Sequence, residues 1–99
     1  MPDRTVFFVS DGTGITAQML GNSLLTQFEG QEFRQVTLPF IASIDKAEEA
    51  VRKINATEHE DRLRPIVFST LVKDELRSVV KRSNGLFLDF FGLRSYLHR

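Results

Sequence analysis

The sequence predicts a three-layer α/β fold in which a mainly parallel, four-stranded sheet lies between helices. Short apolar runs rich in valine and phenylalanine alternate with segments of helical periodicity, which gives the order β-α-β-α-β-α-β. The apolar runs do not alternate strictly with polar residues, as is typical of strands covered on both faces. A chain of 99 residues, 41% of them apolar, can build one modest core, so a single domain is expected.

The first half of the chain is expected to form a strand, a helix and a second strand. Residues 5–10 are rich in Val and Phe and stop at an Asp-Gly pair, which predicts a buried strand. Gly21, inside the helix that follows, costs about 1 kcal/mol relative to alanine, which indicates a close packing contact. Residues 33–40 form the next extended run, which Pro39 ends. The helix is expected to face inward with Ile15, Met19, Leu20, Leu24 and Phe28.

The second half is expected to continue with helix, strand, helix and strand. Asp45 is predicted to cap a helix, with Glu48 three residues later as in a capping box, before a polar connection over residues 56–64. The inward stripe of this helix is formed by Ala47, Ala50, Val51 and Ile54. The remaining elements are a buried strand at 65–69, a helix from about Leu71 or Lys73 to Ser83, and a strand at 86–91. Asn84-Gly85 is predicted to be a left-handed C-cap, with a hairpin turn as the alternative.

Composition excludes several classes of function. Thirteen basic and thirteen acidic residues cancel, so no global field favours nucleic acid or an anionic membrane as partner. The chain has no cysteine, which excludes disulfides and thiolate metal sites and fits a reducing, cytoplasmic setting. From the sequence, no signal peptide and no membrane span are expected. His59 and His98 are expected at the surface, far apart in the sequence, so no metal site is predicted.

The carboxyl ends of the predicted strands define the edge where a ligand is expected, because open parallel sheets bind ligands there. A two-glycine turn between the first strand and the first helix would direct helix amides and the positive end of the helix dipole toward an anion. Candidate phosphate or ligand contacts on this edge are Ser10, Asp11, Gly12, Thr13, Gly14, Ser69 and Thr70. Ser69 and Thr70 are equally well explained as the start of the next helix.

The glycine turn fits a dinucleotide-binding motif only in part. Residues 12–17 satisfy G-x-G-x-x-A between a strand and a helix, as in a Rossmann-like unit. The acidic residue that would hold the ribose at the end of the second strand is missing, because that place reads Thr37-Leu38-Pro39-Phe40. No Lys followed by Ser or Thr closes the loop, so it is not a Walker A motif. A tight turn in which Thr13 or Asp11 caps the helix and a small-anion site explain the pattern equally well.

Several segments together resemble the bacterial phosphoenolpyruvate synthase regulatory proteins, whose close relatives regulate pyruvate, phosphate dikinase. The resemblance runs in order from about residue 5 to residue 92 without large gaps. The matching segments are residues 7–17, 20–28, 38–41, 46–47, 54–55, 64–72 and 88–92.

This resemblance implies a bifunctional serine/threonine kinase and pyrophosphorylase. Such a protein uses ADP to phosphorylate a threonine of phosphoenolpyruvate synthase, or of pyruvate, phosphate dikinase, and uses inorganic phosphate to remove that group with release of pyrophosphate. The target's catalytic histidine must be phosphorylated for the kinase direction. Whether the chain forms a homodimer is left open. Neither nucleic acid nor a membrane is an expected partner.

The chain departs from the resembled family toward its C-terminus. Residues 1–92 are expected to be the N-terminal α/β domain, and residues 93–99 diverge from the family pattern. The Walker-like loop of the family's later half is absent from the sequence, so the chain is expected to be inactive alone and no catalytic residue can be assigned. A truncation, a frameshift and a degenerate paralogue would each explain this ending. The alternative function is a free-standing small-anion or nucleotide-binding module.

Overall fold

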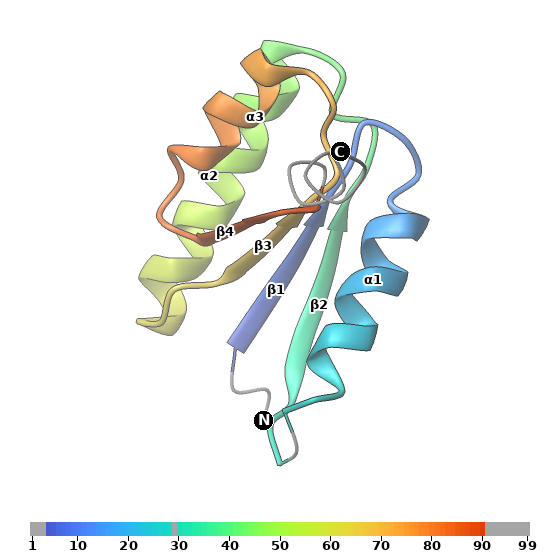
Figure 1. Cartoon of the computed structure of the whole chain (residues 1–99). Helices are drawn as coiled ribbons and strands as arrows, with labels where there is room; N and C mark the ends of the chain where they lie inside the picture. Colours follow the sequence, from blue (N-terminus) through green and yellow to red (C-terminus); the bar gives the residue numbers. More distant parts are fainter. Residues whose placement is uncertain (1–3, 29, 91–99) are drawn as a thin grey trace.

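The computed structural model describes residues 4–28 and 30–90, and these form strands and helices in strict alternation (Figure 1). The elements are β1 (Arg4–Val9), α1 (Ile15–Leu25), β2 (Phe33–Leu38), α2 (Ile44–Asp61), β3 (Ile66–Ser69), α3 (Asp74–Lys81) and β4 (Leu86–Asp89). This order confirms the predicted β-α-β-α-β-α-β succession. Phe91, predicted as the end of the last strand, and the divergent segment 93–99, which includes His98, lie outside the described residues.

The four strands form one parallel sheet in the order β2-β1-β3-β4. Phe7 of β1 lies at the centre, level with Val36 of β2 on one side and Val67 of β3 on the other. Helix α1 covers one face of the sheet, and α2 and α3 cover the other (Figure 1). The predicted three-layer α/β fold is therefore confirmed.

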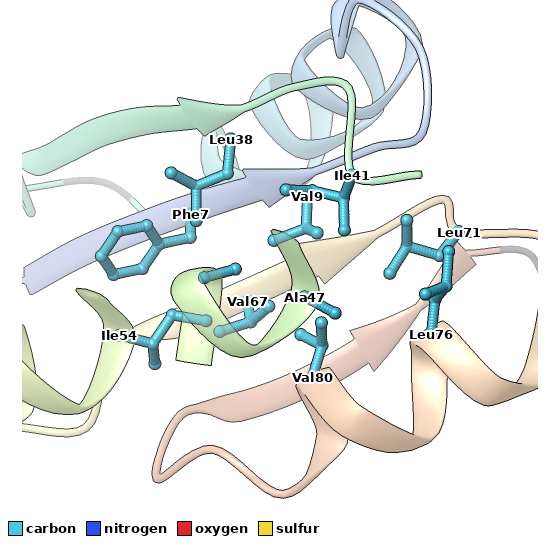
Figure 2. Close-up of a cluster of buried hydrophobic side chains, with 11 residues drawn as sticks. Phe7, Val9, Leu38, Ile41, Ala47, Ile54, Val67, Leu71, Leu76 and Val80 are labelled. Atoms are coloured by element: carbon cyan, nitrogen blue, oxygen red, sulfur yellow. The ribbon is translucent and has the colours of Figure 1, made fainter. Parts of the chain in front are cut away.

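Successive residues of β1 point to opposite faces of the sheet and supply both halves of the core. Phe7 and Val9 face α2 and α3, where they pack with Ile54, Val67 and Val80 (Figure 2). Val6 and Phe8 face α1 and pack with Ala17, Leu25 and Phe68. On this second face the Phe8 and Phe68 rings stack with centroids 5.8 Å apart, and Phe68 and Phe90 stack at 5.0 Å. Aromatic packing thus continues across β1 and β3 to the end of β4.

The predicted inward face of α1 is wrong. Its sheet side consists of the smaller set Ala17, Gly21 and Leu25, at positions i, i+4 and i+8. The larger apolar side chains are exposed, with Ile15 at 60%, Met19 at 66%, Leu20 at 47%, Leu24 at 43% and Phe28 at 50%. At position 21 the helix lies so close to the Phe8 ring that a side chain would overlap it, so glycine forms the contact there. The close contact predicted at Gly21 is confirmed.

Helix α2 begins earlier and ends later than predicted. Its N-cap is Ser43, whose Oγ accepts a hydrogen bond from the Lys46 backbone amide at 3.3 Å. Asp45, the predicted cap, lies inside the first turn, where its negative charge interacts favourably with the helix dipole. The predicted polar connection from residue 56 is helical up to Asp61, and exposed His59 lies in the last turn.

The segment between α3 and β4 is neither the predicted left-handed cap nor a hairpin. Helix α3 ends at Lys81 with a right-handed C-cap, and β4 runs parallel to β3. The connection is instead held by hydrogen bonds with residues outside this segment. The Asn55 side chain accepts from the Asn84 backbone amide at 2.8 Å, and Arg64 donates to the carbonyls of Asn84 and Gly85 at 3.1 and 3.2 Å. These long-range bonds replace a local capping motif.

Candidate functional site

The carboxyl ends of β1 and β3 form the topological switch point of the sheet. From β1 the chain crosses through α1 on one face to β2, and from β2 it returns through α2 on the opposite face to β3 (Figure 1). In open α/β sheets such a divergence creates the crevice where ligands bind. The loop after β3 begins beside the last residue of β1, because the Thr70 backbone amide donates to the Val9 carbonyl at 3.0 Å. The candidate residues predicted after β1 and after β3 are thereby brought together.

The glycine turn after β1 is built from local hydrogen bonds. Ser10 is buried, and its Oγ accepts from the Gly12 backbone amide at 3.0 Å. Thr13 Oγ1 accepts from the Ile15 amide, the first of α1, at 3.4 Å, so the Thr13 contact expected for a tight turn is present. Gly14 occupies the N-cap position with φ of 87°. Asp11 and Thr13 are exposed and face the solvent at this edge.

The loop that follows β2 is attached directly to the glycine turn. The Ile41 amide donates to the Ser10 carbonyl at 2.9 Å, and the Phe40 amide donates to the Gly12 carbonyl at 2.8 Å. Phe40 has the left-handed φ of 59°, and its side chain is 62% exposed. A left-handed conformation is uncommon for a large residue and is found most often where a function or a tight connection requires it. This left-handed residue was not predicted from the sequence, because a Pro-Phe pair after a strand is not specific for such a conformation.

Ser69 repeats at the end of β3 the arrangement that Ser10 has at the end of β1. Ser69 is fully buried, and its Oγ accepts from the Leu71 amide at 3.2 Å. Each serine hydroxyl therefore accepts from the amide two residues later, which turns the chain sharply as it leaves the sheet. Helix α3 begins only at Asp74, so Ser69 is the last residue of β3, Thr70 lies in the loop after it, and neither is at the start of the helix.

An ion pair at the end of β4 was not anticipated. Arg77 Nη1 lies 3.4 Å from Asp89 Oδ2, and Arg77 also pairs with Asp74 one helical turn earlier. The Arg77 and Asp89 side chains are only 19% and 29% exposed. The i, i+3 spacing of Asp74 and Arg77 could have predicted the helical pair. Nothing in the sequence pairs Arg77 with the distant Asp89, because that contact depends on the packing of α3 beside β4.

At this edge the Thr13 side chain is exposed, whereas Ser10 and Ser69 are buried, and the glycine turn contains no lysine. Within residues 4–28 and 30–90, no group of three or more His, Cys, Asp or Glu side chains could hold a metal ion. In the same part of the chain, no helix has the length and apolar character needed to span a membrane.

Comparisons with known proteins give the family of the chain. A family model described as kinase/pyrophosphorylase matches residues 6–94. A protein from Janthinobacterium sp. (strain Marseille), assigned as a phosphoenolpyruvate synthase regulatory protein, is 62% identical over 86 residues, which cover 87% of this chain and 30% of that protein. Relatives with the same assignment are 54% identical in Polaromonas sp., over 94% of this chain and 34% of the relative, and 49% identical in Hahella chejuensis, over 90% and 33%. No solved structure gives a significant match.

The chain thus spans about a third of the length of the curated relatives that it matches. The matched segment includes every described strand and helix beyond the first residues of β1. The resemblance inferred from the sequence is confirmed, and the chain belongs to the kinase/pyrophosphorylase family.

Proposed function

We propose that this chain is the N-terminal α/β part of a bifunctional regulator of phosphoenolpyruvate synthase. In this proposal the whole regulator transfers a phosphoryl group from ADP to a threonine of the synthase and inactivates it. Inorganic phosphate then removes the group as pyrophosphate and restores the synthase. The observation that carries the proposal is the match over residues 6–94, together with 62% identity to a relative assigned as such a regulator.

The chain alone is proposed to lack phosphoryl-transfer activity. Transfer from a nucleotide needs a phosphate cradle with a cationic side chain, which a P-loop supplies through its glycine-rich backbone and its lysine. The sequence contains no G-x-x-x-x-G-K-[ST] segment, and the turn at residues 10–14 has no lysine. Residues that follow the matched third in the relatives are therefore proposed to carry the nucleotide site.

The edge formed by Ser10, Asp11, Gly12, Thr13, Gly14, Ser69 and Thr70 is proposed as a secondary phosphate contact or a surface for partner recognition. Its support is positional. Thr70, the first residue after β3, donates to the carbonyl of Val9, the last residue of β1, and Gly14 is the N-cap of the helix that follows β1. The carboxylate of Asp11 would repel a phosphate placed beside it, so the amides and hydroxyl groups are the proposed contacts.

Titration of the 99-residue chain with ADP, phosphate and pyrophosphate, followed by amide chemical shifts, tests this proposal. We expect no tight ADP binding. We expect shifts with phosphate or pyrophosphate to be confined to the amides near residues 10–14 and 69–71. Tight ADP binding would contradict the proposal and support a free-standing nucleotide-binding module.

A further inference from the structure

Helix α1 and the turn after it expose five large apolar side chains, together with polar residues such as Thr16, Gln18 and Ser23, and carry no charge. We define the outer face of α1 as Ile15, Met19, Leu20, Leu24 and the adjacent Phe28, which are between 43% and 66% exposed. No charged residue occurs from residue 15 to residue 28. The side of α1 that packs on the sheet is complete without these residues, because Ala17, Gly21 and Leu25 already form it.

The other two helices of the described chain have the surface expected of solvent-exposed helices. Arg52, Lys53 and Glu60 are exposed on α2, and Glu75 and Lys81 are exposed on α3. Large apolar side chains gathered on one exposed element, with no charged residue among them, are typical of an interface. The outer face of α1 therefore differs from the rest of the surface in a way that the fold of this chain does not require.

The sheet beside α1 is also incompletely covered. Ile66, Leu88 and Phe90 belong to the core on the α1 face but are only partly buried. The opposite face, which carries α2 and α3, has partly buried apolar residues as well, namely Val36, Val79 and Phe87. Apolar surface thus remains exposed on the α1 side of the sheet as well as on the helix itself.

We propose that the outer face of α1 is the docking surface for the polypeptide that follows the matched third in proteins of this family. The relatives contain this polypeptide, since the match covers only 30% to 34% of their lengths. A segment joined through the same chain has a high effective concentration, so even a modest apolar face suffices to hold it.

A second copy of this chain fits the surface less well. The five side chains of the outer face together expose on the order of 500 Å², below the roughly 800 Å² per partner that a stable interface between separate proteins buries. The proposal rests on the family match and not on the catalytic function. Its test measures chemical accessibility, so a failure of kinase activity would leave it unaffected.

The absence of cysteine from the chain allows a single reporter thiol. Met19→Cys places a thiol on the outer face of α1. Leu63→Cys is the matched control, because Leu63 is a similarly exposed apolar residue, at 45%, in the connection between α2 and β3. Each variant is made in the 99-residue chain and in a hybrid, in which residues 6–94 replace the matched segment of the Janthinobacterium relative. The rate of alkylation is followed on the reporter peptide by mass spectrometry.

We expect the Met19→Cys thiol to react about tenfold or more slowly in the hybrid than in the chain alone, because alkylation then requires local opening of the covered face. The Leu63→Cys thiol should react at similar rates in both. Equal rates for Met19→Cys in the two proteins, or equal protection at both positions, would overturn the proposal. Protection of Met19→Cys in the chain alone that rises with its concentration would assign the face to a second copy, and would also overturn it.

Cooperative thermal unfolding of the hybrid verifies that it folds. If it does not fold, the same cysteine is introduced into the full-length relative at the residue that pairwise alignment places at Met19. Its alkylation rate is then compared with that of Met19→Cys in the chain alone. An independent variant, Leu24→Gln, should leave the melting temperature of the chain alone unchanged or higher and lower that of the full-length protein. A similar effect in both proteins would contradict docking at this face.

Discussion

Helix α1 rests directly on the ring of Phe8. A Cβ atom added at Gly21 would overlap Cε1 of that ring and lie 3.1 Å from both Cδ1 and Cζ. Phe8 is fully buried and stacks on Phe68, so its ring cannot move aside without disturbing the centre of the core. This contact sets the distance between α1 and the sheet, and it explains why glycine occupies position 21 on the inward side of the helix.

Gly21→Ala should therefore destabilise the protein, although alanine is the better helix former by about 1 kcal/mol. We expect a net loss of about 1–3 kcal/mol in the free energy of unfolding, because overpacking a rigid core outweighs the helix preference. Urea denaturation measures it. Ser23→Ala, at an exposed position of the same helix, is the control and should be neutral or slightly stabilising. A stabilised Gly21→Ala variant would show that α1 does not approach Phe8 this closely.

The two glycines of the turn after β1 should respond differently to alanine. Gly14 has φ of 87°, and an added Cβ would lie 2.6 Å from Thr37 Cγ2, so Gly14→Ala combines backbone strain with a steric clash. We expect a loss of about 1–3 kcal/mol. At Gly12 the nearest atom to an added Cβ is Ser10 Oγ, at 3.9 Å, so Gly12→Ala should change stability by less than about 0.5 kcal/mol.

Thr37→Ser separates strain from clash at Gly14, because serine lacks the Cγ2 methyl group. Combined with Gly14→Ala, it should restore part of the lost stability while the strain remains. Equal denaturation midpoints for the Gly12 and Gly14 variants would contradict the left-handed conformation of Gly14.

The start of α2 offers a test of its cap. Ser43→Ala removes the oxygen that accepts from the Lys46 amide and should cost about 1 kcal/mol. Asp45→Ala removes only a favourable charge from the first turn and should cost less, about 0.3–1 kcal/mol at low salt, with the loss shrinking as salt is added. Thermal melts of both variants at low and high salt measure the difference. A larger, salt-independent loss for Asp45→Ala would restore Asp45 as the cap.

The succession of strands and helices along the chain was predictable from the sequence, because each element has a local pattern of apolar and polar residues. Residues 5–10 and 65–69 are continuous apolar runs between turn residues, and such runs suit a sheet covered on both faces. The inward face of α1 was not predictable. The apolar periodicity of the helix predicts that its larger apolar residues face the sheet. In the structure Gly21 faces the sheet, because it packs against the Phe8 ring of β1.

The candidate site was predictable in position but not in detail. The carboxyl-end rule brings Ser10 and Ser69 to one edge, where the structure places them. The left-handed Phe40 and the Arg77–Asp89 pair depend on contacts between loops and elements that are far apart in the sequence. Asn84-Gly85 resembles a local cap, yet bonds from Asn55 and Arg64 hold this segment in a different conformation.

Asp11→Asn in the hybrid tests whether the turn takes part in phosphoryl transfer. We expect both activities to stay within about threefold of the unsubstituted hybrid, because Asp11 is exposed and the proposed phosphate contacts are amides and hydroxyl groups. Assays with ADP and with phosphate measure the two directions. A loss of about 100-fold or more in either direction, the scale expected for removing a general base, would place the Asp11 carboxylate in the reaction.

The most direct test of the proposed function is the effect of the hybrid on phosphoenolpyruvate synthase. We expect the hybrid to inactivate synthase whose catalytic histidine is phosphorylated when ADP is supplied, and to reactivate it when ADP is replaced by phosphate, with pyrophosphate released. The 99-residue chain alone should do neither. A cooperatively folded hybrid without activity in either direction, beside an active full-length relative, would contradict the account. Phosphorylation of the synthase by the chain alone would contradict it equally.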